Sequence, residues 1–252
     1  MGFSVSADAY GAFMGRYAEP LADATVAELQ LRAGQRALDV GAGPGALTAR
    51  LVSALGVHAV AAVDPSETFV AALRARFPGL RVECTTADRL RFPDASFDTT
   101  VAQLVVHFMP DPVRGLTEMA RVTRPGGQVA ASVWDFGGGR HPLGVFWRAA
   151  KDLDPDAPDE SDLPGTRDGQ LVALFTQAGL HDLRPLTLPS TRTFAGFEQW
   201  WEMFELGVGP AGDYVAALDA VTKQRLRTRC AELLPAGPFD IDAVAWTVIG
   251  RR

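Results

Sequence analysis

The middle of this 252-residue chain alternates short, β-branched apolar runs with longer segments that have the periodicity of a helix. The apolar runs occupy residues 36–41, 57–63, 80–85, 97–104 and 127–134. The helical patterns between them occupy residues 45–55, 66–77 and 112–123. This alternation is typical of a parallel sheet with helices on both faces. We therefore expect an α/β fold built on a doubly wound sheet.

The segments that flank residues 36–134 complete the predicted architecture. Residues 8–30 carry apolar and aromatic side chains at helical spacing, which predicts an N-terminal helical cover. Two more strands are predicted, at residues 183–193 and at the alternating AVAWTVIG sequence near the end of the chain. The sheet would then have seven strands and be mostly parallel.

Residues 194–237, between these last two strands, have a helical period and many aromatic side chains. They predict a helical lid inserted before the last strand. The aromatic residues suit either the wall of a site for a small, partly apolar ligand or an ordinary core. They include Phe194, Phe197, Trp200, Trp201 and Phe204. We expect residues 1–252 to form one domain that contains this insertion.

Residues 136–166 are predicted to be a loop and contain the acidic stretch DLDPDAPDESDLPG. Its aspartates at 152, 154 and 156 match the first three ligand positions of a calcium-binding EF-hand loop. Ala157 and Leu163 replace the glycine and the closing glutamate that such a loop requires. We therefore interpret the stretch as a solvated acidic loop and expect no metal site.

Composition and charge exclude several classes of protein. The net charge of −6, without a basic run, disfavours binding to nucleic acid or to an anionic membrane. No apolar stretch approaches the roughly 18 residues of a membrane span, and the N-terminal sequence shows no secretory signal. Because Cys84 and Cys230 are the only cysteines, a disulfide scaffold is excluded. We expect a cytoplasmic protein, either a monomer or a homodimer.

A glycine-rich turn follows the first predicted strand. The sequence RALDVGAGPG runs from this strand through Gly41, Gly43 and Gly45 into a helix. Such a turn lets a ligand approach bare backbone at a helix N-terminus. With Ala46, the turn also satisfies the dinucleotide-binding pattern G-x-G-x-x-G/A, and Asp64, which ends the next strand, is placed to bind a ribose diol. The turn and Asp64 alone do not separate a dinucleotide from another nucleoside.

Asp39 favours a cationic ligand. It lies two residues before Gly41, at the carboxyl end of its strand, where its charge would oppose a pyrophosphate. The same charge would attract an ammonium group. The carboxyl half of the chain also lacks a recognisable Tyr-x-x-x-Lys pair, which further disfavours a dehydrogenase-like dinucleotide binder.

Four motifs follow one another in the chain: LDVGAGPG, VDPS, TADRLRFPDASFD and MARVTRPGG. Together they resemble the class I S-adenosylmethionine (SAM)-dependent methyltransferases, in particular the small-molecule group like the ubiquinone and menaquinone biosynthesis enzymes. The resemblance covers residues 8–134 well and the last two strands loosely. It implies a Rossmann-like fold with a SAM-binding core at residues 36–134. It also implies SAM as the cofactor, S-adenosylhomocysteine (SAH) as its product, and no metal.

The resemblance implies which residues bind SAM. Asp39 would favour the ammonium group of the methionine end, and Gln103 would lie beside the same moiety. Asp64 would bind both ribose hydroxyls, with Pro65 and Ser66 against the adenine. The methionine carboxylate would be taken by the backbone of Gly41, Ala42, Gly43 and Gly45.

Two further segments are implied to contact the cofactor. Asp88, with Arg89 and Leu90 beside it, would accept a hydrogen bond from the exocyclic amine of adenine. In related proteins an N-terminal helix closes over the cofactor, and the sequence FMGRY resembles that helix. The candidate contacts from this cover are Tyr10, Arg16 and Tyr17.

Two histidines are candidates for a general base. His107 follows Gln103 by four residues and falls at the carboxyl edge of the sheet, where ligands bind in open α/β folds. His141, in the loop after the fifth strand, is a weaker candidate. Either histidine also suits a purely structural role at the start of a loop.

The acceptor is expected to be a small molecule. The chain has QLVVH after the fourth strand, where nucleic-acid amino-methylating enzymes carry an Asn- or Asp-Pro-Pro-aromatic motif. We therefore expect a SAM-dependent methyltransferase that acts on an oxygen, nitrogen or carbon of a metabolite by in-line displacement. Two alternatives stay open: a non-catalytic SAM- or SAH-binding protein and, less favoured, an NAD(P)-binding oxidoreductase.

Overall fold

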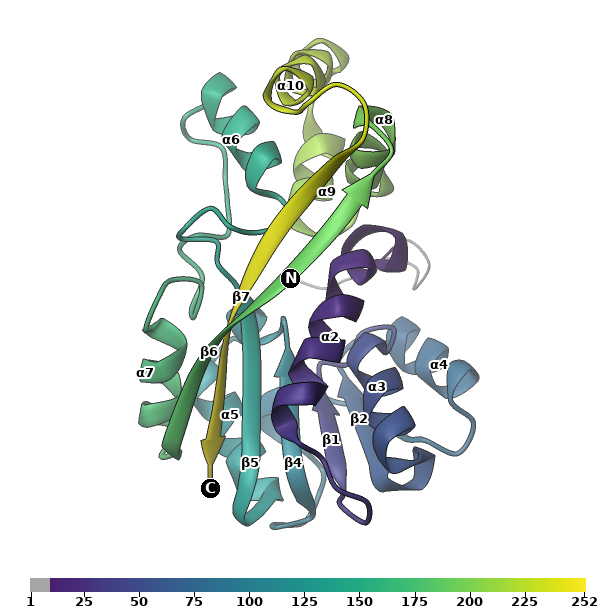
Figure 1. Ribbon diagram of the computed structural model, residues 1–252, viewed down its shortest axis with the longest axis vertical. Coiled ribbons are helices and arrows are strands. Elements are labelled where there is room, and N and C mark those ends of the chain that lie inside the picture. The colour runs from purple at the N-terminus through teal and green to yellow at the C-terminus, as the bar shows by residue number, and fades with distance from the viewer. Residues whose placement is uncertain (1–9) are drawn as a thin grey trace.

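The computed structural model of the chain describes residues 10–252, and Figure 1 shows their arrangement. Residues 8 and 9 of the predicted N-terminal cover lie outside the described residues. The rest of the cover forms a short π-helix, η1 (Gly11–Gly15), that continues into α2 (Arg16–Leu29). Helix α2 packs along α3 (Ala46–Leu55) and β6 (His181–Phe194), so it covers one face of the sheet.

The centre of the described chain is a seven-stranded sheet in the order β3-β2-β1-β4-β5-β7-β6. Neighbouring strands among β1 to β5 are parallel, whereas β7 runs antiparallel to both β5 and β6. The remaining strand bounds are β1 (Ala37–Val40), β2 (Val60–Asp64), β3 (Arg81–Cys84), β4 (Phe97–Gln103), β5 (Thr123–Trp134) and β7 (Phe239–Arg251). The prediction of a mostly parallel, Rossmann-like sheet is confirmed.

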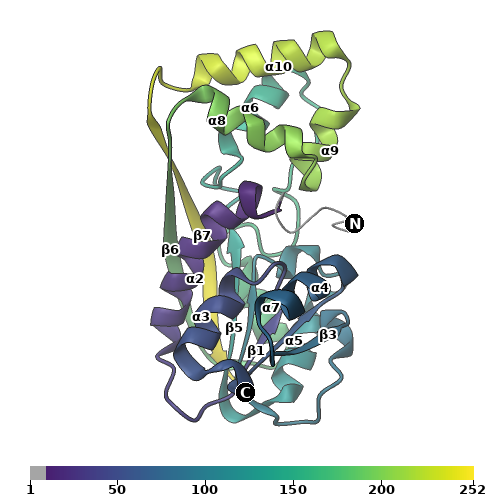
Figure 2. The same ribbon diagram turned by 90° about the vertical axis from the view of Figure 1, so that its right-hand side faces the viewer.

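Helices cover both faces of the parallel strands (Figures 1 and 2). On one face α2, α3 and α4 bury leucines such as Leu51 and Leu73 against the sheet. On the other face α5 and α7 bury Met119 and Phe175. Successive strand residues alternate between these two apolar layers, as the period of a strand requires. The bounds are α4 (Glu67–Arg76), α5 (Pro112–Val122) and α7 (Gln170–Gln177).

Strands β6 and β7 extend far beyond the parallel part of the sheet (Figure 1). Strand β5 pairs with β7 only over residues 245–251, whereas β6 pairs with β7 up to the Phe194–Phe239 pair. The distal ends of the two strands therefore form a two-stranded arm. Between them the chain forms four helical segments in the order α8 (Phe197–Trp201), η5 (Glu202–Leu206), α9 (Gly209–Ala217) and α10 (Ala220–Leu233).

A further helix, α6 (Gly144–Leu153), lies with these segments at the same end of the molecule (Figure 2). We call α6 and the segments from α8 to α10 the cap. The sequence predicted loop throughout residues 136–166, so α6 corrects that prediction. Its ten residues bury Phe146, Trp147, Ala149 and Ala150 on one side. The surrounding glycines, prolines and aspartates hide this short amphipathic pattern in the sequence.

The aromatic side chains within residues 194–237 form the core of the cap. Phe204 is fully buried and stacks on Phe146 with ring centroids 4.4 Å apart. The Trp200 ring meets the Phe204 ring edge-on, with centroids 4.7 Å apart. The ring of Phe13, in η1, also meets Phe204 edge-on, with centroids 6.0 Å apart. Of the two roles that the sequence allowed for these aromatic residues, packing is the one observed. The Phe204 ring thus joins α6 to the other segments of the cap and joins the cap to the N-terminal cover.

No helix within residues 10–252 is both long enough and apolar enough to cross a membrane.

The substitution Phe204→Ala should lower the free energy of unfolding by about 3–5 kcal/mol, because it empties a close-packed aromatic site. Urea unfolding followed by circular dichroism measures this loss. The matched control is Leu206→Ala, whose side chain in the same segment is 41% exposed, and it should change stability by less than about 0.5 kcal/mol. Equal effects of the two substitutions would contradict the packing described for the cap.

Candidate functional site

A cleft of about 390 Å³, open to solvent, lies at the carboxyl edge of the parallel strands. Because parallel strands end at the same edge of a sheet, the residues that follow β1, β2, β3 and β4 meet there. Seven residues predicted to bind the cofactor line this cleft. They are Tyr10, Gly41, Gly43, Asp64, Pro65, Ser66 and Gln103.

The glycine turn between β1 and α3 depends on the absence of side chains. Gly41, Gly43 and Gly45 have φ angles of 70°, 54° and 92°, which L-residues with side chains rarely adopt. A Cβ atom on Gly41 would lie 2.5 Å from Cγ2 of Val105, in the segment after β4. Gly41 and Gly43 present their backbone to the cleft, whereas Ala42 and Gly45 do not line it.

The Asp64 carboxylate fastens this turn to the end of β2. Its Oδ2 accepts a hydrogen bond from the Gly43 amide at 2.8 Å, and its Oδ1 accepts one from the Ser66 amide at 2.8 Å. Burial raises the pKa of Asp64, although these two bonds oppose the shift. The side chain is only 6% exposed but still lines the cleft, so it offers a carboxylate to a ligand there.

Asp39 lies behind the glycine turn rather than in the cleft wall. Its side chain is 1% exposed, and its Oδ2 accepts a hydrogen bond from the Thr48 hydroxyl at 2.6 Å. Burial raises the pKa of Asp39 to about 7, with the nearby Asp64 charge adding to the shift. In this structure Asp39 supports α3 from β1, at the base of the predicted site.

Gln103 carries a buried polar atom that no described residue satisfies. Its Nε2 donates a hydrogen bond to the Ala18 carbonyl at 2.8 Å, which ties the end of β4 to α2. Its Oε1 is buried without a hydrogen-bond partner in residues 10–252, and the residue lines the cleft. Since leaving such an acceptor unpaired costs free energy, the cleft is suited to a ligand that donates a hydrogen bond here.

The segment after β3 reaches the cleft three residues earlier than the sequence suggested. Thr85, Thr86 and Ala87 line the cleft, whereas the three residues predicted to approach adenine do not. A hydrogen bond from the Thr86 side chain lowers the pKa of Asp88. Leu90 is buried in the apolar layer beneath α5, and Arg89 is exposed.

Of the three candidates from the N-terminal cover, Tyr10 reaches the cleft. Its ring meets Phe69 of α4 edge-on at 5.4 Å. Tyr17 is instead 1% exposed and packs against Trp134 and Phe194. Arg16 lines a separate polar groove on the surface, together with side chains of α2, α3 and β6.

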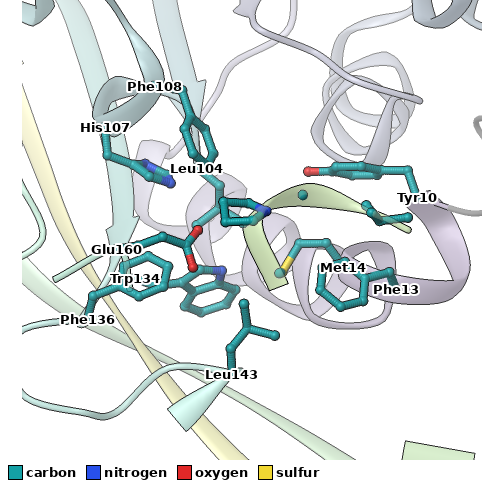
Figure 3. A pocket seen from close by; sticks show the side chains of 13 residues that line it. Tyr10, Phe13, Met14, Leu104, His107, Phe108, Trp134, Phe136, Leu143 and Glu160 are labelled. Carbon is teal, nitrogen blue, oxygen red and sulfur yellow. The ribbon is translucent and has the colours of Figure 1, made fainter. Parts of the chain in front are cut away.

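A second cavity, of about 30 Å³, lies beside the cleft and beneath the cap, and Figure 3 shows the side chains that line it. Most of its lining is apolar and comes from η1, β5, the loop after β5 and the start of α9. Its walls include Phe13, Met14, Trp134, Phe136, Leu143 and Val208. Tyr10, Leu104 and Phe108 line both this cavity and the cleft, so one wall separates the two spaces.

Leu104 is held in that wall by its backbone. It has a φ of 61°, the left-handed region that a branched side chain disfavours. Its amide donates a hydrogen bond to the Ser132 carbonyl of β5 at 2.8 Å. Strain of this kind persists where surrounding structure enforces it and is concentrated at functional sites.

His107 lines the apolar cavity rather than the cleft. The side chain is 4% exposed, its Nδ1 has no hydrogen-bond partner within residues 10–252, and it contacts the Phe108 and Phe136 rings. Burial lowers the pKa of His107 to about 3. The imidazole is therefore neutral near pH 7, and it is a weak base.

Glu160 is a cavity residue that the sequence analysis missed. It belongs to the acidic stretch interpreted as solvated, and three aspartates of that stretch do form ion pairs near the surface, with Arg229, Lys151 and Arg167. Glu160 is instead 4% exposed and lines the cavity beneath the cap. Burial raises its pKa to about 7, although a hydrogen bond from Trp147 opposes the shift. Nothing in the local sequence distinguishes it from its exposed neighbours.

Residues 38–131 match the family profile described as "Methyltransferase domain". The chain is 41% identical over 103 residues to an uncharacterised methyltransferase of Mycobacterium tuberculosis. These 103 residues are 41% of this chain and 41% of that protein. The chain thus spans about two fifths of the length of this relative. A phosphatidylethanolamine N-methyltransferase of Cereibacter sphaeroides is 35% identical over 148 residues, which cover 56% of this chain and 70% of that protein.

A solved structure shares the fold across nearly the whole chain. It is phosphoethanolamine N-methyltransferase 2 of Haemonchus contortus, in complex with phosphomonomethylethanolamine and SAH. The TM-score is 0.61 and the sequence identity 16%, with 98% of this chain and 56% of that chain covered. This likeness extends beyond the matched profile to the antiparallel strands and the cap.

The raised pKa of Asp39 predicts a dependence of stability on pH. Between its ordinary value of 3.8 and about 7, the folded chain holds a proton on Asp39 that the unfolded chain has lost. The stability that this proton contributes is therefore present at low pH and declines as the pH rises to about 7. Asp39→Asn cannot titrate and keeps an acceptor for Thr48, so it should gain stability relative to the wild type over this range. Urea unfolding of both proteins at several pH values measures this difference, and parallel pH profiles would contradict it.

Proposed function

Because the chain belongs to the class I SAM-dependent methyltransferase family, we propose that it transfers a methyl group from SAM to a small-molecule acceptor. The observation that carries this proposal is the adjacency of two spaces, a cleft beside the glycine turn and an apolar cavity beneath the cap. The cleft is the proposed donor site and the cavity the proposed acceptor site. Residues 1–252 would act as one domain, with the sheet binding the donor and the cap enclosing the acceptor.

The residues of the cleft suit a cationic nucleoside of this kind. When bound, SAM supplies a methyl group already activated by its positive sulfur. Asp64 offers a carboxylate to a ribose diol, and the unpaired Oε1 of Gln103 offers an acceptor to an ammonium group. The bare backbone of Gly41 and Gly43 leaves room for a carboxylate. The Asp39 carboxyl lies behind the turn, where a bound cation would favour its charged form.

The other sequence assignments stay predictions of the same proposal. Pro65 and Ser66 lie beside Asp64 in the cleft wall and are proposed to pack on the adenine. Asp88, Arg89, Leu90, Arg16 and Tyr17 lie outside the lining of the cleft, as do Ala42 and Gly45. The proposal gives them supporting roles around the cofactor.

The names of the relatives agree on methyl transfer, but they do not agree on the acceptor. Their names include demethylmenaquinone methyltransferase, malonyl-[acyl-carrier protein] O-methyltransferase and 27-O-demethylrifamycin SV methyltransferase. These names refer to three different acceptors. The acceptor of this chain therefore depends on the shape and chemistry of its own cavity.

Isothermal titration calorimetry of the purified chain tests the proposal. SAH should bind with a dissociation constant in the micromolar range, and NAD(H) should give no binding heat. The reverse result would favour the dinucleotide alternative and overturn the proposed function.

Asp64→Ala should weaken the binding of SAH by about 2 kcal/mol or more, roughly 30-fold, because two ribose hydroxyls would lose a charged partner. Calorimetry measures the change, and circular dichroism checks that the variant is folded. The matched control is Glu67→Ala, an exposed acid three residues further along the chain, whose affinity should equal that of the wild type. Unchanged affinity in Asp64→Ala would place the ribose elsewhere.

A further inference from the structure

The carboxyl group of Glu160 is directed into the cavity beneath the cap. Figure 3 shows it between the rings of His107 and Trp134. Its Oε2 accepts a hydrogen bond from the Trp147 indole at 3.2 Å, and no other hydrogen bond reaches it from residues 10–252. One carboxyl oxygen is therefore available to a molecule in the cavity.

The other residues that line the cavity limit which chemical groups such a molecule can carry. No lysine or arginine lines the cavity within the described chain, so a carboxylate or phosphate would find no cationic partner there. An ammonium group would pair with the Glu160 carboxylate, but its nitrogen gains a free electron pair for methyl transfer only after it has given up a proton. A hydroxyl group can both donate a hydrogen bond to the carboxylate and attack through its oxygen. The aromatic walls suit a flat, apolar body beside that hydroxyl.

The titratable groups around Glu160 leave it as the proton acceptor near neutral pH. Burial lowers the pKa of His107 to about 3 and that of the adjoining His141 to about 4, and it raises the pKa of Tyr10 to about 12. The nearby acid Asp159 is paired with Lys151. Asp135, which faces His141, is paired with Arg140 at 2.7 Å. Tyr214 packs edge-on against Trp147, with ring centroids 5.7 Å apart, and burial raises its pKa.

We propose that Glu160 is a catalytic residue that accepts the hydroxyl proton of an apolar phenol or enol bound beneath the cap. This inference rests on the proposed methyl transfer and names the substrate class and the base for it. The new oxygen–methyl bond forms as the methyl–sulfur bond breaks, and the sulfur keeps the electron pair and loses its charge. The hydroxyl proton passes to the carboxylate of Glu160.

The first experiment measures binding with two probes of similar size, 4-ethylphenol and 4-ethyltoluene, by calorimetry at pH 8 and pH 6 in the presence of SAH. At pH 8 the phenol should bind about tenfold or more tightly than the toluene, since a hydrogen bond to a charged group is formed. The preference should shrink at pH 6, where Glu160 is protonated. In Glu160→Gln the preference for 4-ethylphenol over 4-ethyltoluene should be small and independent of pH. The control Glu202→Gln, an exposed acid of the cap, should behave as the wild type.

The second experiment measures release of SAH from SAM in the presence of 4-ethylphenol. The wild type should turn over faster at pH 8 than at pH 6. Glu160→Gln should be slower by about 100-fold or more and lose this pH dependence, as expected for a missing general base.

Equal binding of the two probes at pH 8, absence of phenol binding, or absence of turnover by the wild type would overturn the inference. So would wild-type behaviour of Glu160→Gln in either experiment. SAH affinity is measured in the same samples and separates the two proposals. Retained SAH binding with any of these results overturns the role of Glu160 alone, whereas loss of SAH binding in the wild type overturns the proposed function.

Discussion

The antiparallel pairing of β6 with β7 is the constraint on which the two-part architecture depends. These strands are longer than β5 can cover, so their distal ends pair only with each other and project past the carboxyl edge of the sheet. The helices between them are thereby held over the edge where the parallel strands end. The apolar cavity therefore lies between cap and sheet, next to the cleft.

The wall between the two spaces comes mainly from the chain that leaves β4. Gln103 faces the cleft, Leu104 and Phe108 face both spaces, and His107 faces the cavity. Val105, between them, packs so closely on Gly41 that only glycine fits there. One short segment thus fixes the glycine turn on one side and borders the cavity beneath the cap on the other. Displacing it would disturb both proposed binding sites together.

How much the sequence predicts depends on how local each feature is. The strands, the glycine turn and Asp64 follow from adjacent residues, and the structure places Gly41, Gly43 and Asp64 around one cleft. Helix α6 was missed because its burial depends on Phe204, far along the chain. Glu160 was missed for the same reason, since distant segments make its environment and several acids of the same stretch are exposed. Cavity walls of this kind have no period or spacing that a single sequence can show.

Burial connects the proposed chemistry to the fold. Asp39, Asp64 and Glu160 all have a pKa raised by burial, because the surrounding protein solvates a charged carboxylate poorly. The proposed reaction begins with a sulfonium cation and a carboxylate and ends with a neutral thioether and a neutral acid. An environment that disfavours charge therefore favours the products over the reactants and strengthens the attraction between the reacting charges. The cap contributes to methyl transfer on this view by excluding water as well as by shaping the acceptor site.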